Sequence, residues 1–190
     1  MARPVEFDRT LARDRALLLF WRRGYQAASL SDLLAAMEIS RSSFYAAFGD
    51  KRALFLECLD LFAERTLNFL NGTLETTPPL DGLKRFFEMG LGRMGDGESH
   101  WGCLLVNTSL EMAGVDDALS QRASAHLAQV QAAFEASLLT TGCPPQKAAD
   151  LSAVLMLLLE GLRVSSRRAL PPETQRNQIH TAFRIVDAAL

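Results

Sequence analysis

A short stretch near the N-terminus carries side chains that can hydrogen-bond to nucleic acid. Ser40, Arg41, Ser42, Ser43 and Tyr45 stand within six consecutive residues. Arginine hydrogen-bonds to guanine edges or to phosphate, serine hydroxyls suit either target, and a tyrosine hydroxyl reaches a phosphate. These residue types at this spacing predict DNA binding by the outward face of one helix.

Such a face needs an apolar back and a second helix that holds it. Phe44 and Phe48 supply the back, and Ser40 is a suitable N-cap for the helix that carries them. Ser29 and Asp32 form a capping-box pattern that starts the preceding helix. Three residues join the two helices, which is the right length for a helix-turn-helix. The alternative is an ordinary helical hairpin with a solvated arginine and solvated serines.

The next helix starts after a break at Gly49-Asp50. Lys51 stands in its first turn, where free backbone amides and the helix dipole favour a phosphate group. The charge distribution also favours a polyanion as the partner of the N-terminal part of the chain. Residues 1–52 hold nine Lys and Arg against six Asp and Glu, while the whole chain of 190 residues has a net charge of -2.

Nothing in the sequence points to catalysis, a metal or a cofactor. The three histidines and three cysteines are scattered, and no metalloprotease motif, phosphate-binding glycine loop or nucleophile elbow occurs. Cysteines without a pairing pattern indicate a reducing compartment. An enzyme is therefore the weaker alternative, and an adaptor that binds only protein leaves the pattern at Arg41, Tyr45 and Lys51 unexplained.

The chain predicts an all-α fold with no membrane span. Apolar residues recur with helical period through about nine segments, including a sixth from about Gly102 to Met112 and a seventh from about Asp116 to Leu139. The longest apolar run, 153–159, is far below the roughly 20 residues of a membrane span. We expect a soluble cytoplasmic protein with a DNA-binding domain at 1–49 and a larger helical domain at 50–190.

The first part of the chain closely resembles the TetR/AcrR family of transcriptional regulators. The residues that carry the resemblance are Ala16, Leu19-Phe20, Gly24-Tyr25, Ser29-Leu30, Asp32-Leu33, Ser40-Arg41, Ser43-Phe44-Tyr45, Phe48, Lys51 and Leu54-Phe55. The resemblance implies a homodimeric repressor that binds double-stranded operator DNA and is released by a small-molecule effector, although an activator is also compatible. The implied DNA contacts are Arg3, in an N-terminal arm that enters the minor groove, and Ser29, Ser40, Arg41, Ser42, Ser43, Tyr45 and Lys51.

Two residues depart from the family pattern. Glu38 stands where members usually have glycine, because the residue after the second helix often has a positive φ. A glutamate there costs about 1 kcal/mol if that conformation is kept. Ala47 replaces a frequent polar side chain, which removes one phosphate contact. Both departures bear on operator sequence and affinity rather than on DNA binding itself.

The resemblance also implies an effector cavity in the C-terminal domain. Aromatic and methionine side chains suit an adaptable apolar pocket, and a few polar groups orient the ligand. The candidates are Phe62, Phe86, Met89, Trp101, Cys103, Asn107, Glu111 and Phe134. Each could instead belong to the core, and Asn107 and Glu111 could merely hydrogen-bond a neighbouring helix. The segment around Cys103 resembles a branch of the family that senses electrophiles through a cysteine, with His100 as a group that could stabilise a thiolate.

The last two helices of such regulators form a four-helix bundle across a two-fold axis. Two apolar stripes fit this role, and they contain Leu151, Val154, Leu155, Leu158, Leu162, Ile179, Phe183 and Val186. A dimer places two recognition helices about 34 Å apart, in successive major grooves. The alternative is that both stripes are core of a single chain. We expect the effector to act by shifting the fourth helix, which is continuous with Lys51.

Overall fold

A computed structural model describes residues 7–92, 101–168 and 170–190 of the chain. The described residues form α-helices and no strands, which confirms the all-α prediction. The helices are α1 (Arg9–Arg23), α2 (Leu30–Met37), α3 (Arg41–Phe48), α4 (Lys51–Thr76), α5 (Pro79–Gly92), α6 (Leu104–Met112), α7 (Asp117–Leu139), α8 (Pro145–Ser166) and α9 (Pro172–Ala189).

The two short helices near the N-terminus begin at the capping residues that the sequence predicts. The Ser29 hydroxyl accepts from the Asp32 amide at 3.1 Å, and the Asp32 carboxylate accepts from the Ser29 amide at 3.1 Å, which closes a capping box on α2. The Ser40 hydroxyl accepts from the Ser43 amide at 3.1 Å and caps α3. These bonds satisfy amides that a helix start leaves without partners.

Backbone conformation explains two details at the turns. Glu38 has φ 57° and ψ 40°, so the turn between α2 and α3 keeps the left-handed geometry even though the residue is not glycine. The start of α6 falls at Leu104, two residues after the predicted Gly102, because Gly102 has φ 72° and Cys103 is an extended N-cap. Both features therefore lie at helix ends, where sequence patterns place boundaries least accurately.

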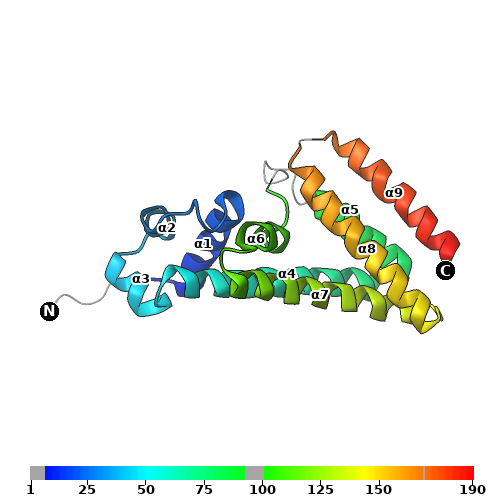
Figure 1. Cartoon of the computed structure of the whole chain (residues 1–190), viewed down its shortest axis with the longest axis horizontal. Helices are drawn as coiled ribbons and strands as arrows, with labels where there is room; N and C mark the ends of the chain where they lie inside the picture. Colours follow the sequence, from blue (N-terminus) through cyan, green and yellow to red (C-terminus); the bar gives the residue numbers. More distant parts are fainter. Residues whose placement is uncertain (1–6, 93–100, 169) are drawn as a thin grey trace.

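Two long helices that run side by side, α4 and α7, organise the fold. In Figure 1, α4 and α7 run side by side along the molecule, with α1–α3 at one end and α5, α8 and α9 at the other, while α6 lies beside α1. One apolar cluster joins Phe20, Phe44, Phe55 and Leu105, so the core of the N-terminal helices continues into α4 and α6 across the predicted boundary at 49. None of the helices in the described part of the chain is long and apolar enough to cross a membrane.

Most of the predicted dimer stripe is buried within the single chain, so five of its eight residues have little surface to offer a second copy. Leu155, Leu162, Ile179, Phe183 and Val186 are each at most 5% exposed. They are buried because α8 packs on α7 and α9 packs on α5, in a second apolar cluster.

The other three residues of the predicted stripe stay at the surface of α8 or partly so. Val154 is 54% exposed, and Leu151 and Leu158 are half-buried. The outward apolar face of α8 therefore includes only the edge of the stripe that periodicity suggests.

Candidate nucleic-acid interface and internal cavity

The outward face of α3 is free to meet a macromolecule. Phe44 and Phe48, its apolar back, are 0% and 4% exposed, whereas the side chains of Arg41, Ser42 and Tyr45 are exposed. The Tyr45 ring lies edge-on to Phe44, with centroids 5.5 Å apart, so its hydroxyl is carried on a packed base. A cation, a hydroxyl and a phenol therefore share one exposed helical face.

The remaining predicted DNA contacts have further roles within the chain. The hydroxyls of Ser29 and Ser40 cap α2 and α3, and Ser43 lies 2.8 Å from the Ser40 hydroxyl. The Lys51 ammonium lies 4.5 Å from the centroid of the Tyr25 ring, and burial lowers its pKa below the usual value. Arg3 is outside the described residues.

Arg9 fixes α3 to its neighbouring helices, a role that sequence analysis missed. Its guanidinium donates to the Glu57 carboxylate at 2.7 Å and to the Ala47 carbonyl at 3.2 Å, and it lies 4.5 Å from the centroid of the Phe48 ring. It therefore joins α1 and α4 to the C-terminal end of α3. Arg9 and Glu57 are 48 residues apart, so no local pattern signals the pair.

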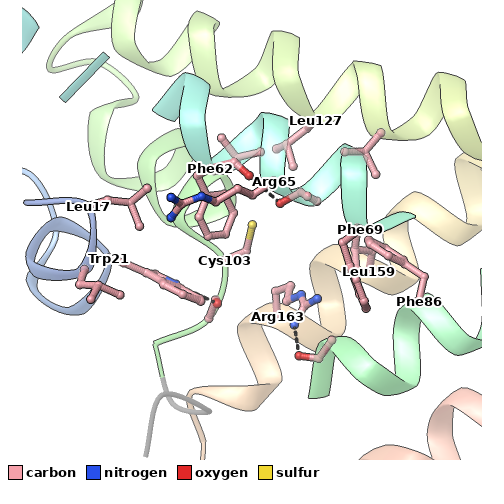
Figure 2. Close-up of a pocket in the computed structure, with 16 residues that line it drawn as sticks. Leu17, Trp21, Phe62, Arg65, Phe69, Phe86, Cys103, Leu127, Leu159 and Arg163 are labelled. Carbon is pink, nitrogen blue, oxygen red and sulfur yellow. Dashed lines mark hydrogen bonds between the residues drawn. The ribbon is translucent and has the colours of Figure 1, made fainter. Parts of the chain in front are cut away.

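A cavity of about 230 Å³ lies where α1, α4, α5, α6, α7 and α8 meet. Figure 2 shows Trp21 approaching from α1, Phe62 and Arg65 from α4, and Arg163 from α8, with the Cys103 sulfur between them. The described lining residues are Leu17, Leu18, Trp21, Phe62, Arg65, Thr66, Phe69, Phe86, Gly90, Gly102, Cys103, Leu105, Leu127, Val130, Leu159 and Arg163. Because α1 supplies part of the wall, the cavity contacts the N-terminal helices as well as α5 and α8.

The structure brings Phe62, Phe86 and Cys103 of the predicted effector set to this cavity. The other apolar candidates lie outside the lining. Phe134 is fully buried in the second apolar cluster, Met89 is 38% exposed on α5, and Trp101 packs edge-on against Trp21 at 5.6 Å. His100, the group considered beside the cysteine, lies outside the described residues.

The two polar candidates, Asn107 and Glu111, bond to neighbouring segments instead of lining the cavity. The Asn107 amide donates to the Trp101 carbonyl at 2.7 Å. The Glu111 carboxylate accepts from the backbone amides of Tyr25 and Gln26, at 3.0 and 2.8 Å. Gly24 has φ 83°, which favours glycine, and a Cβ there would lie 2.8 Å from this carboxylate and displace it.

Two charged groups and a thiol in the cavity wall were not found together by sequence analysis. The Arg163 guanidinium donates to the Gly90 carbonyl at 2.9 Å, and burial lowers its pKa below the usual value. Arg65 pairs with Asp14 at 2.7 Å. Burial raises the pKa of the Cys103 thiol above its usual value, against the opposing effect of Arg163. Among the described residues, no three His, Cys, Asp or Glu side chains are grouped as a metal site needs.

Two family models match the chain. The model for bacterial regulatory proteins of the tetR family matches residues 13–58, which include α2 and α3. The model for the C-terminal domain of LmrA/YxaF-like transcriptional regulators matches residues 79–171.

Individual proteins agree with these matches. The HTH-type transcriptional regulator YezE of Bacillus subtilis (strain 168) is 31% identical over 140 residues, which are 73% of this chain and 72% of that protein. The repressor ComR of Escherichia coli (strain K12) is 44% identical over 63 residues, which are 33% of this chain and 30% of ComR. A cysteine mutant of the TetR-family regulator CifR, solved with 26-bp operator DNA, has a TM-score of 0.82 and 31% identity, covering 96% of this chain and 98% of that one.

Proposed function

This chain belongs to the tetR family of bacterial transcriptional regulators, and we propose that it is a dimeric repressor whose hold on operator DNA is weakened by an effector in the internal cavity. Repression is favoured because ComR and DhaR of Mycobacterium sp. (strain GP1), two relatives that match this chain, are named repressors. The similarity to CifR, a neighbour complexed with operator DNA, supports binding to a duplex.

One observation supports DNA reading most directly. The exposed side chains of Arg41, Ser42 and Tyr45 project from α3, while Phe44 and Phe48 anchor that helix to the core. In a helix-turn-helix, the second helix enters the major groove with such a face. We assign base-edge or phosphate contacts to Arg41 and phosphate contacts to Tyr45.

The apolar outer face of α8 supports a dimer. Val154, Leu157 and Val164 are 54%, 70% and 48% exposed, and Ile185 of α9 is 66% exposed. The three α8 residues lie on one side of the helix, at spacings of three and seven residues. A second copy packed on this face would bury them in a four-helix arrangement. This face shares Val154 with the stripe that sequence periodicity favours and otherwise lies beside it.

An effector in the cavity can move α1–α3, which form the DNA-reading head, through two helices at once. Trp21 of α1 lines the cavity and donates from its indole nitrogen to the Gly102 carbonyl at 3.1 Å. Phe62 lines it from α4, which begins at Lys51 immediately after α3. An effector that separates α1 from α4 changes the spacing between the reading heads of the two subunits. It must bind the released state more tightly, by about 1–3 kcal/mol for ordinary coupling.

Fluorescence anisotropy tests DNA reading. The full-length protein is titrated against DNA from upstream of its gene and against a scrambled duplex, at several salt concentrations. Arg41→Ala is expected to weaken specific binding by about 1–3 kcal/mol, and affinity should fall as salt rises. Arg176→Ala is the control: it makes the same charge change at an exposed position of α9 and should have little effect. No preference over scrambled DNA at any salt contradicts the proposal for that DNA.

Covalent sensing through Cys103 is a second candidate, favoured by the position of the thiol in the cavity wall. The amides of Leu105 and Val106 at the start of α6 favour its thiolate, but burial raises the pKa of the thiol. The resting sulfur is therefore a protonated thiol, which is a weak nucleophile. N-ethylmaleimide tests this route: it should release the protein from operator DNA but not release Cys103→Ser. Release of both proteins to the same extent excludes Cys103 as the sensor.

A further inference from the structure

Aromatic side chains dominate the wall of the internal cavity. Trp21, Phe62, Phe69 and Phe86 line it, and leucines supply most of the remaining apolar side chains. Trp21 lies edge-on to Phe62, with ring centroids 5.1 Å apart, and Phe69 is tilted against Phe86 at 5.6 Å. Figure 2 shows the first pair on one side of the Cys103 sulfur and the second pair on the other. A ligand in the cavity therefore meets rings from two directions.

The polar side chains of the wall already have partners within the chain. Among the described lining residues, these side chains are Thr66, Arg65 and Arg163. The Thr66 hydroxyl donates to a main-chain carbonyl of its own helix at 2.8 Å, and Arg65 pairs with Asp14 at 2.7 Å. The Arg163 guanidinium is engaged within the chain as well. A ligand that pairs with either cation therefore competes with an interaction that the protein already makes.

Burial acts against charge of either sign in this part of the molecule. It raises the pKa of the Cys103 thiol, which disfavours the thiolate, and it lowers the pKa of Arg163, which disfavours the guanidinium. An ion that enters the cavity loses its hydration in the same way. An uncharged ligand avoids that loss and gains from contact with the apolar wall.

The volume of the cavity limits the number of rings. An apolar cavity of roughly 150 Å³ in a protein admits benzene, and pockets for drug-sized ligands begin at about 300 Å³. The cavity of this chain, at about 230 Å³, lies between these values. It suits a substituted ring or two fused rings better than a larger polycyclic compound.

We propose that the effector is an uncharged aromatic compound of one or two rings that packs among Trp21, Phe62 and Phe86. The proposal rests on the proposed function, because it names the chemical class that the repressor senses. Trp21 belongs to α1 and Phe62 to α4, so a ring inserted beside them contacts both helices that lead to the DNA-reading head.

Isothermal titration with compounds of one shape and different charge tests the selection. The probes are 4-ethylacetophenone, 4-ethylbenzoate and 4-ethylbenzamidinium, each titrated into the full-length protein at neutral pH. The ketone should bind about tenfold or more tightly than either ion, because only the ions lose a charged group's hydration. The saturated analogue, 1-(4-ethylcyclohexyl)ethanone, should bind about two- to tenfold more weakly than the aromatic ketone, since it lacks ring–ring contacts.

Variants of the wall locate the binding. Val130 lines the cavity and is 1% exposed, so Val130→Phe places a ring in the space of the ligand and should weaken ketone binding about tenfold or more. Val115→Phe makes the same change at a position that is 66% exposed and should leave ketone binding unchanged. Phe62→Leu keeps an apolar wall but removes one ring, and should bring the affinities of the two ketones closer together. Circular dichroism and thermal melting verify that each variant is folded.

Four outcomes overturn the proposal: an ion that binds as tightly as the ketone, no binding by the ketone, unchanged ketone binding in folded Val130→Phe, or an unchanged preference for the aromatic ketone in folded Phe62→Leu. Operator anisotropy on the same preparations tests the effector role, because the ketone should weaken operator binding. Binding of the ketone without that effect also overturns the proposal. A protein that prefers its operator but fails these tests refutes only the effector class, whereas a protein without operator preference refutes the proposed function.

Discussion

The left-handed residue between α2 and α3 gives a sharp test of the fold of the reading head. Glu38 has φ 57° and ψ 40°, a conformation in which the Cβ of an L-residue crowds the backbone. Its carboxylate also pairs with Arg15 at 2.7 Å, although the glutamate side chain is 71% exposed. Replacing Glu38 by glycine and by alanine separates these two effects, because both variants lose the ion pair and only glycine relieves the strain.

The magnitude follows from opposing backbone effects. The left-handed conformation costs a residue with a Cβ about 1–2 kcal/mol. Glycine avoids that cost but loses more chain entropy on folding, by about 0.4–1 kcal/mol. Glu38→Gly should therefore be more stable than Glu38→Ala by roughly 0.5–1 kcal/mol, as the difference of these two terms. The lost ion pair, about 0–1 kcal/mol at an exposed site, cancels in the comparison.

Urea unfolding at fixed protein concentration measures this difference, with a matched pair in the adjacent helix. Ala35 is exposed within α2, where glycine is less stable than alanine by about 1 kcal/mol in helical conformation. The alanine-to-glycine change should therefore stabilise the protein at position 38 and destabilise it at position 35. The same sign at both positions would refute the left-handed turn at Glu38.

Three further predictions concern the dimer face, the contact between the two ends, and acid stability. Leu157→Lys should halve the solution mass measured by light scattering. Leu110→Lys changes a leucine of similar exposure on α6 (68%, against 70% for Leu157) and should leave a dimer. An unchanged mass in Leu157→Lys rejects the outer face of α8 as the dimer interface. Glu111→Gln should speed hydrogen exchange at the two backbone amides that the carboxylate holds, by about tenfold if one charged bond of about 1.4 kcal/mol is lost, and unchanged exchange contradicts that role. Hydrogen bonds from Arg122 hold the pKa of Asp60 below 3.8, so this aspartate stabilises the protein above that pH and the benefit is lost as pH falls further. Asp60→Asn should therefore lower the free energy of unfolding by up to about 1 kcal/mol at neutral pH, with the difference from the native protein shrinking in acid; a constant difference contradicts this.

The reading head could be predicted from sequence because its signals are local. The capping box of Ser29 and Asp32 and the N-cap Ser40 act within three residues, and the structure confirms both. Phe44 and Phe48 differ by four residues, so helical period alone places them on one face. The positive φ at Glu38 was anticipated from the resemblance to a family with glycine there, since glutamate by itself gives no such signal.

The cavity could not be assembled in the same way because its parts come from distant segments. Trp21 and Gly102 are 81 residues apart, and Arg163 and Gly90 are 73 apart. Aromatic residues at helical spacing fit a core and a pocket equally well, which is why Phe134 was included although it is fully buried in the core. A single arginine after an apolar helical run also suits a solvated helix end, so Arg163 gave no signal of its own.

Helix α8 shows the limit of apolar periodicity most clearly, because it is apolar on two sides. Leu155 and Leu162 face the core and are 0% and 5% exposed, while Val154 and Leu157 are 54% and 70% exposed. Val154, Leu155 and Leu157 lie in one uninterrupted apolar run, and Leu162 follows it after Glu160 and Gly161, so the hydrophobic pattern indicates burial for all four. Only the position of α7 and α9 decides which side the chain itself covers. The side left uncovered is where a second copy gains most from contact, since exposed apolar area of this kind usually marks an interface.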